Sequence, residues 1–403
     1  MTRFGASSDD RMISSGGRRV SFLRPLSTVH RPPEMPLLRD ITTFLKQLAP
    51  TSLAEKWDNV GLLLGDEERE VRRVVTCLTL SPDVAREAVA ERAELVVTHH
   101  PILFRPVQRI TAGDAAGRML LDLLAARIAI YSPHTGYDSA ELGINQQLAE
   151  MFELREIVPL RNRPAQPSDT CKIVCFVPES DADAVRQALA DAGTGAIGEY
   201  SECSFSASGT GRFRGSERSH PAIGQPGRLE CVAESRIEVD CPTSRLGDAI
   251  SRMRAVHPYE QPAFDIYPLT EEPDGLGAGR CGSLPAEITL ADFMDTVKTR
   301  LRVTQLQHVG DPTLRVRRVA VACGAGGEFV SDAIRLDCQV LLTGEARFHS
   351  CLEARENGLA LVLPGHYATE RPAMERLAEV LTGQFPDLTV WPSRVECDPV
   401  RYG

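Results

Sequence analysis

The sequence predicts an α/β fold in which two α/β halves with mostly parallel sheets form one unit, interrupted by a smaller α+β domain of ferredoxin-like type. Three observations support this prediction. Apolar strands alternate with amphipathic helices from Pro36 onward, the pattern changes after a Pro-containing linker near residue 162, and it returns from about Pro285. A chain of 403 residues is also long enough for two or three domains. The expected domains cover 35–160, 165–270 and 275–403.

The composition is that of an ordinary globular protein, with 42% hydrophobic and 25% charged residues. No stretch approaches the about 20 consecutive apolar residues that a membrane helix needs, so no membrane association is expected. The formal net charge of -10 argues against nucleic acid bound by bulk charge. A small molecule or another protein is the expected partner.

The 11 cysteines are scattered from Cys77 to Cys397 without a C-x-x-C pair, and their number is odd. This pattern favours small buried thiols in a reducing compartment over a disulfide framework. We therefore expect a cytoplasmic protein.

Residues 1–34 carry several Arg, Ser and Gly residues and no apolar periodicity, which predicts a disordered tail. An organelle presequence is a second interpretation, which Asp9 and Asp10 oppose. A start at Met35 is a third, because a regular helical pattern begins there.

In the first half, strands are expected at 71–80, 94–100 and 128–132, and helices at 36–48, 82–92, 115–126 and 140–151. In the insert, the order βαββαβ is expected from strands at 171–178, 228–239 and near 263–267, helices at 181–192 and 243–256, and a Gly/Ser-rich region over 193–227. In the second half, helices are expected at 290–301, 328–335, 346–357 and 371–381, between strands at 316–323, 339–344, 359–364 and 388–392. The segment GLGAGRCG (275–282) superficially resembles a phosphate loop, but no strand precedes it, and we expect a tight connection there.

Two adjacent histidines, His99 and His100, follow the apolar run LVV and precede Pro101. Neighbouring side chains of a strand point to opposite faces, unless the strand ends and turns at that point. At the carboxyl edge of a parallel sheet, where ligands bind in this architecture, the two imidazoles could each serve a metal ion. A pair of hydrogen-bonded loop histidines explains the motif equally well.

Two further motifs follow predicted strands. His134 and Asp138 lie in SPHTGYD, where Asp138 is either a carboxylate ligand or the N-cap of a helix that starts at residue 139 or 140. His366 and Glu370 are four residues apart, which places both on one face if the helix has begun. Otherwise Thr369 caps the helix, and a surface ion pair remains an alternative.

Each of these three strand-ending loops brings His or a carboxylate to the same edge of the sheet. A shared metal site explains this convergence better than three separate coincidences do. Mixed nitrogen and oxygen ligands suit Zn, Mn, Fe, Co or Ni better than Ca or Mg. Two such ions about 3.5–4 Å apart would acidify a bridging water toward a pKa of ~7. The two divalent metal ions are expected to be held by His99, His100, Asp138, His366 and Glu370.

Three more residues near predicted strand ends are candidates for catalysis by proton transfer or for support of the metal ligands: His134, Glu345 and His349. Helix capping and surface pairing explain them equally well.

The motifs EKWDNVGLLLGD, VVTHHPILF, SPHTGYDSAELGINQQLAE, HPYEQPAFDIYPL, LLTGEARFH and GHYATE, in this order, resemble the Nif-three-like dinuclear metal family. Its members are often named GTP cyclohydrolase 1 type 2 homologues, and the resemblance covers about residues 36 to 395. It implies that the five ligands named above bind a metal pair. It also implies an insert similar to small trimeric regulatory domains, and a homohexamer.

The chain departs from the family pattern at Gly136-Tyr137, at Glu345, where Asp is usual, and at Cys281, where an aliphatic residue is usual. None of these is an expected ligand. The function that we expect is a metal-dependent hydrolase, resembling GTP cyclohydrolase, in which a metal-activated water attacks a nucleotide-like small molecule. The alternative is a non-catalytic, metal-loaded scaffold or regulatory protein with a ligand-sensing insert.

Overall fold

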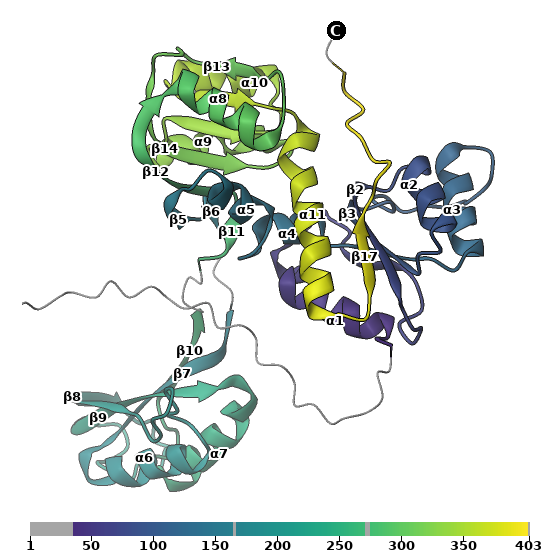
Figure 1. Cartoon of the computed structure of the whole chain (residues 1–403). Helices are drawn as coiled ribbons and strands as arrows, with labels where there is room; N and C mark the ends of the chain where they lie inside the picture. The colour runs from purple at the N-terminus through teal and green to yellow at the C-terminus, as the bar shows by residue number, and fades with distance from the viewer. Residues whose placement is uncertain (1–34, 164–166, 271–274, 402–403) are drawn as a thin grey trace, which may run out of the picture.

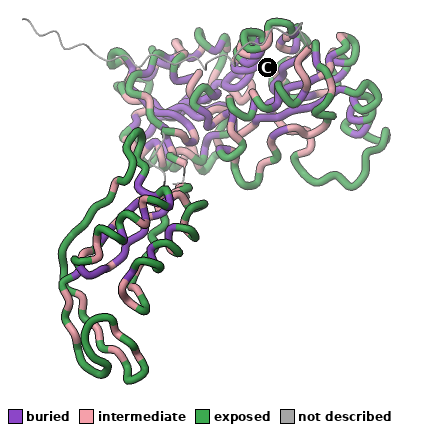
Figure 2. Tube along the Cα trace, turned by 90° about the horizontal axis from the view of Figure 1, so that it is seen from below, coloured by how far each residue is buried: buried purple, intermediate pink, exposed green. Residues whose placement is uncertain are grey.

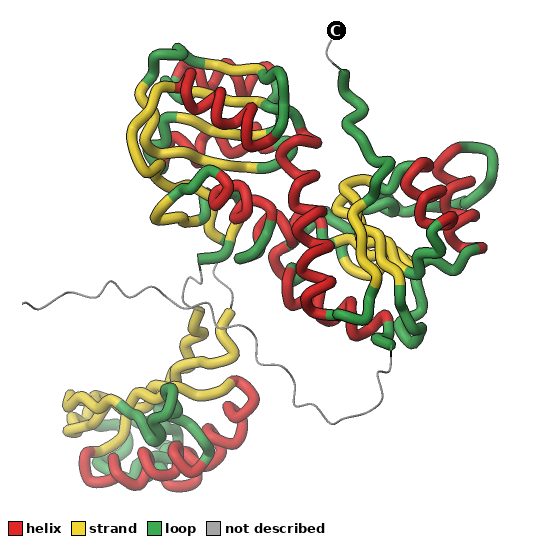
Figure 3. The backbone as a smooth tube through the Cα atoms, viewed as in Figure 1, coloured by secondary structure: helices red, strands yellow, loops and turns green. Residues whose placement is uncertain are grey.

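Two sheets joined by a long helix make up the larger part of the molecule (Figures 1 and 3). The computed structural model describes residues 35–163, 167–270 and 275–401. The prediction of a disordered tail over 1–34 lies outside the described residues. Within those ranges, no helix combines the length and the apolar character that a membrane span requires.

The first sheet has the strand order β1-β4-β3-β2-β17. Strands β4, β3, β2 and β17 run parallel, and β1 pairs antiparallel with β4, so the prediction of a mostly parallel sheet is confirmed here. The central strands β2, β3 and β4 are almost wholly buried, and hydrophobic clusters lie on both faces of this sheet. The elements are β1 (Gly61–Leu64), β2 (Arg73–Thr79), β3 (Leu95–His100), β4 (Ala129–Ser132) and β17 (Thr389–Pro392), with α1 (Leu38–Leu48), α2 (Pro82–Ala90) and α3 (Ala115–Ala125).

The second sheet has the order β13-β16-β15-β14-β12-β5 and is mixed. Strands β14, β15 and β16 are parallel, whereas the pairings of β13, β12 and β5 are antiparallel. The elements are β5 (Arg155–Val158), β12 (Arg280–Thr289), β13 (Gln307–Val309), β14 (Arg315–Ala322), β15 (Val340–Thr343) and β16 (Ala360–Leu363), with α8 (Leu290–Leu301), α9 (Val330–Arg335) and α10 (Phe348–Glu356).

The sequence predicted a tight connection at 275–282, but this segment also contributes to two strands. It forms β11 (Gly277–Ala278), which pairs with β6 (Arg161–Asn162), and the start of β12. Gly279 has φ +63, and a Cβ there would lie 2.9 Å from the Cβ of Leu160. The glycines that suggested a loop therefore allow the chain to pass closely over its neighbours before it enters the sheet.

The two halves exchange strands. β5 lies at the end of the first half in sequence but pairs in the second sheet, and β17, near the C-terminus, pairs with β2 in the first. Helix α11 (His366–Gln384) runs between the halves (Figure 1). One hydrophobic cluster includes Leu95 from the first sheet, Val340 from the second, and Met374 and Leu377 from α11. The halves therefore share this central core, and each half also has a second hydrophobic cluster of its own.

The insert has the order βαββαβ and an antiparallel sheet, β10-β7-β9-β8, of which three strands were expected from the sequence. The second strand, β8, lies in the Gly/Ser-rich region, where no strand was expected. It forms because it pairs with β9 along its whole length. The insert also has its own core, with Ile173 and Leu189 (Figure 2). The elements are β7 (Pro167–Pro178), α6 (Ala182–Asp191), β8 (Phe205–Arg214), β9 (Leu229–Pro242), α7 (Leu246–Val256) and β10 (Phe264–Thr270).

If α11 supports both halves, Leu377→Ala should destabilise the protein by about 2–5 kcal/mol, because Leu377 is fully buried and its loss leaves a cavity. The matched control is Leu124→Ala, on a helix at a 42% exposed position, which should change the stability by less than about 0.5 kcal/mol. Urea unfolding, followed by the fluorescence of the two tryptophans, Trp57 and Trp391, measures the difference. Equal effects of the two substitutions would contradict a shared core.

Candidate metal site

The histidines and carboxylates singled out in the sequence meet where β3 and β4 end and α11 begins. His99 and His100 are the last residues of β3. His134 and Asp138 lie on the short helix α4 (His134–Ser139), directly after β4. His366 is the first residue of α11. The architecture therefore brings residues that are up to 271 positions apart into one cluster.

His99 is fully buried, and neither of its ring nitrogens has a hydrogen-bond partner among the described residues. Its Nε2 lies 3.5 Å from Oδ1 of Asp138 and 3.9 Å from Oε2 of Glu370. Burial lowers the pKa of His99 to about 3, so the imidazole is neutral at pH 7 and its lone pair is available. Buried polar atoms are nearly always paired, so these two nitrogens indicate a missing partner such as a metal ion.

The ring of His100 lies next to that of His99, with 5.2 Å between the ring centroids, and belongs to the same cluster. Its Nδ1 hydrogen bonds with the hydroxyl of Thr79 at 2.7 Å, and its Nε2 with Oε2 of Glu370 at 3.1 Å. Thr79 is the register partner of His100 on the adjacent strand β2. The adjacent histidines can both reach the site because β3 ends at His100.

The sequence predicted that a helix begins at Arg371, but helix α11 begins five residues earlier, at His366. Thr369 does not cap the helix. Its hydroxyl accepts a hydrogen bond from the backbone N–H of Gly324 and donates one to the carbonyl of His366, which holds the first turn in place.

The early start of α11 puts His366 and Glu370 on one helix face. Nε2 of His366 is 3.0 Å from Oε2 of Glu370 but lies outside hydrogen-bond geometry, and its Nδ1 is 3.1 Å from Oε1 of Glu345. Glu370, with help from Glu345, raises the pKa of His366 to about 9. Burial alone would raise the pKa of Glu370, but His100 and His366 outweigh it and hold this pKa well below its usual range.

Asp138 was predicted to lie in a loop, as a ligand or as an N-cap. The capping hypothesis is wrong, because Asp138 lies within α4 and the next helix, α5 (Ile144–Met151), has Gly143 at its N-cap. Burial, together with the charge of Glu370, raises the pKa of Asp138 to about 7. The thiol of Cys323, at the end of β14, lies 3.2 Å from Oδ1 of Asp138.

Asp58 is a site residue that the sequence analysis missed. Its Oδ1 hydrogen bonds with Nδ1 of His134 at 2.7 Å, and its Oδ2 accepts from the backbone N–H of Thr135 at 3.2 Å. Asp58 thus caps α4 from a distant loop and also orients His134. Burial alone would lower the pKa of His134, but the bond to Asp58 and the charge of Asp138 outweigh it, so this pKa is raised.

The side chains form two overlapping groups, and within each group the potential ligand atoms lie within 4.8 Å of one another. One contains His99, His100 and His134, and the other contains His100, His366 and Glu370. The nitrogen and oxygen donors, with the unpaired nitrogens of His99, fit a divalent transition metal. His349 is exposed on α10 with its ring beside Phe348, and no contact in the described part of the chain links it to either group.

The fold and this cluster define an α/β protein with a candidate metal site at the carboxyl edge of its first sheet. The family model of DUF34/NIF3 (NGG1p interacting factor 3) matches residues 36–399, and the chain belongs to this family.

Two relatives, both named GTP cyclohydrolase 1 type 2 homolog, show how far the similarity extends. The one from Halalkalibacterium halodurans is 35% identical and covers 90% of this chain and 98% of its own, and the one from Bacillus subtilis is 36% identical with the same coverage. Among solved structures, a Bacillus cereus protein related to NIF3 superposes with a TM-score of 0.65 at 34% identity, covering 92% of this chain and 100% of its own. A Staphylococcus aureus protein superposes with a TM-score of 0.70 at 26% identity, covering 91% and 99%.

If Asp58 orients His134 toward a metal, Asp58→Asn should weaken zinc binding roughly 10- to 100-fold, the usual cost of losing a residue that positions a ligand. The amide oxygen can still cap α4, so the fold should persist, as circular dichroism would verify. The control is Asp66→Asn, at an exposed loop position. Competition with a chelating dye measures the affinity, and unchanged binding in Asp58→Asn would refute the role.

Proposed function

We propose that this protein binds two divalent metal ions and acts as a metal-dependent hydrolase on a nucleotide-like substrate. The observation that carries the proposal is the buried, neutral imidazole of His99, whose two nitrogens have no partner among the described residues although carboxylates and three more histidines surround it. The names of the relatives, GTP cyclohydrolase 1 type 2 homolog, support a nucleotide as substrate.

In this proposal, five side chains hold the metal pair: His99, His100, Asp138, His366 and Glu370. His100 lies between the two groups and is close enough to both to link them. When bound, divalent metals would supply an activated water and polarise the substrate's electrophilic atom. The residues of the chain contribute a buried and rigid frame, since Thr79 and Glu345 each hold one ligand imidazole through its Nδ1.

His134 is proposed as the group that moves protons. Its Nδ1 is occupied by Asp58, which leaves Nε2 to face the cluster or to serve as a further ligand. Glu345, with a side chain that is 61% exposed, is proposed to support His366 and to exchange protons with solvent. His349 was a third candidate from the sequence, but its exposed place beside Phe348 gives no support for a role in proton transfer.

The implied homohexamer and the cytoplasmic location belong to the same proposal. The thiol groups of buried residues such as Cys77 and Cys175 are unpaired, as is usual in a reducing compartment. Light scattering on a sizing column tests the hexamer, and a mass of one or two chains would contradict it.

The proposal predicts that metal-loaded protein hydrolyses GTP or a related nucleotide, and that His366→Ala abolishes turnover, because the loss of a metal ligand removes the metal-activated water. The control is His308→Ala, at an exposed position outside the cluster. Chromatography of a panel of nucleotides and phosphoesters, with an assay for formate, measures the reaction. Bound metal without turnover of any compound would contradict the hydrolase.

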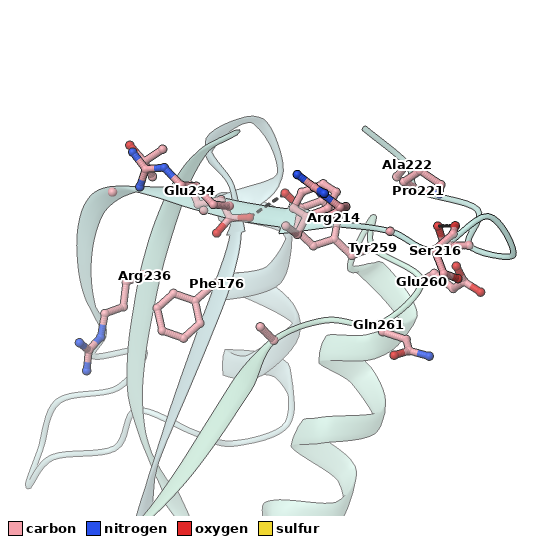
Figure 4. A pocket seen from close by; sticks show the side chains of 18 of the residues that line it. Phe176, Arg214, Ser216, Pro221, Ala222, Glu234, Arg236, Tyr259, Glu260 and Gln261 are labelled. Atoms are coloured by element: carbon pink, nitrogen blue, oxygen red, sulfur yellow. Dashed lines mark hydrogen bonds between the residues drawn. The ribbon is translucent and has the colours of Figure 1, made fainter. Parts of the chain in front are cut away.

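A second candidate function, a regulatory protein with a ligand-sensing insert, is favoured by a hollow of about 880 Å³ on the sheet of the insert (Figure 4). Phe176 and the buried Glu234 lie on this sheet, and the hydroxyl of Tyr259 donates a hydrogen bond to Glu234 at 2.7 Å. A Cβ on Gly211 would lie within 2.6 Å of the carboxylate oxygens of Glu234, so a larger residue at this position would have to displace that carboxylate. Three lining arginines have no ion pair within the described residues: Arg212, Arg214 and Arg218.

The unpaired arginines predict that the insert hollow takes an anion. ATP, citrate or inorganic phosphate should raise the unfolding midpoint by roughly 2 °C or more at saturation, because a ligand of the folded state adds its binding free energy. Arg214→Ala should remove the rise, whereas Arg245→Ala, exposed and outside the hollow, should keep it. Thermal unfolding of metal-loaded protein measures the shift. The sensing function would be refuted by identical curves with and without all three anions.

A further inference from the structure

Two large aromatic side chains lie exposed beside the metal-site cluster. Trp57 is 59% exposed and Phe104 is 44% exposed, and their rings meet edge to face with 5.7 Å between centroids. Both also contact the ring of His134, at centroid distances of 6.2 Å for Trp57 and 6.5 Å for Phe104. Aromatic side chains are usually buried to a large extent, so a pair left open next to a cluster of potential ligands indicates a surface that meets a ligand.

The pair is held firmly in relation to the cluster. Asp58, next to Trp57, is hydrogen bonded to His134, and the backbone N–H of Glu55 donates to the hydroxyl of Thr135 at 3.0 Å. On the other side, the side-chain amide of Asn59 donates to the carbonyl of Leu103 at 2.7 Å, which ties the loop of Trp57 to the loop of Phe104. These bonds hold the loops that carry the two aromatic residues, and both rings stay exposed.

A hollow of about 470 Å³ is lined by Phe104, whose ring meets that of Trp57, and its volume lies within the range that small ligands occupy. Its walls are mostly apolar, and Val107 and Ile110 are 50% and 40% exposed. Arg105 is the charged residue among its lining residues, and Asn59 supplies an amide. Apolar walls that include the ring of Phe104, with one cation and one amide, are suited to a planar heteroaromatic ring that carries polar or anionic groups.

We infer that Trp57 and Phe104 form a stacking subsite for the aromatic base of the substrate, and that the base lies beside His134 at the mouth of the metal site. This inference rests on the proposed function, since it specifies which part of a nucleotide-like substrate the protein recognises. A base held here places its own ring atoms, rather than a distant phosphate, next to His134. Stacking tolerates different bases, so Arg105 and Asn59 would supply the discrimination.

The chain contains two tryptophans, which allows a direct test. Trp391 is buried and 6% exposed, so Trp391→Phe leaves Trp57 as the sole tryptophan. Metal-loaded, full-length Trp391→Phe protein is titrated with guanosine, GTP and ribose 5-phosphate, with excitation at the red edge of tryptophan absorption. Guanosine and GTP should quench the emission in a saturable way, and ribose 5-phosphate should not. The unsubstituted chain is titrated in parallel, with Trp391 as a constant background, in case the variant folds poorly.

Phe104→Ala should weaken guanosine binding roughly 5- to 100-fold, as expected for the loss of one stacking partner, while Phe104→Tyr should bind nearly as well as the unsubstituted chain. The metal content should remain unchanged in both. Calorimetry measures the affinity, and Phe205→Ala, at a 63% exposed position in the insert, is the control.

Two outcomes would overturn the subsite: no quenching by guanosine or GTP in fully metal-loaded protein, or equal binding of ribose 5-phosphate that Phe104→Ala leaves unchanged. Either result would still permit a hydrolase that acts on a non-aromatic compound. Conversely, saturable quenching without turnover would support the subsite and contradict the hydrolase, so the two proposals fail separately.

Discussion

Glu370 brings a carboxylate into the interior where β3 meets α11, and an unpaired charge there would be costly. Nε2 of His100 and Nε2 of His366 lie 3.1 Å and 3.0 Å from its Oε2. His100 ends a strand of the first half, whereas Glu370 belongs to the helix that precedes the last strand of the chain. The contacts that neutralise the charge therefore also join distant parts of the chain. A bound metal would take over this neutralisation, which couples metal binding to the stability of the fold.

A buried ion pair next to Glu370 supports the site further. Arg371, the neighbour of Glu370, forms an ion pair of 2.8 Å with Glu396, and both side chains are at most 10% exposed. Glu396 also accepts hydrogen bonds from the backbone N–H groups of Leu78 and Thr79, at 3.0 and 2.7 Å. Thr79 in turn holds His100. The segment after β17 thus fixes the end of β2, and through it a potential metal ligand, so the C-terminal segment is part of the support of the site.

Features encoded by neighbouring residues could be predicted from the sequence. Helix α8 was predicted with its observed bounds, Leu290–Leu301, because Thr289 and Asp292 form a local capping box. The clustering of the expected metal ligands could also be predicted, because each ligand pair lies at or directly after a strand end of an α/β fold. Features that depend on distant partners could not. Helix α4 depends on Asp58, 77 positions before Thr135, and β8 depends on its pairing with β9. The exchange of β5 and β17 between the sheets is likewise a long-range arrangement that chain order hides.

The potential metal ligands differ in their exposure to solvent, which shows from which side the site is open. The side chain of His99 is 1% exposed, whereas those of His100 and His366 are 28% and 35% exposed. A ligand therefore reaches the cluster from the side of His366 and not through the sheet that buries His99. Trp57 and Phe104 lie beside the cluster, against His134. A molecule with a ring on this aromatic pair and a reactive atom near the exposed imidazoles would span the mouth of the site, whereas a purely structural metal site would need neither the opening nor the exposed rings.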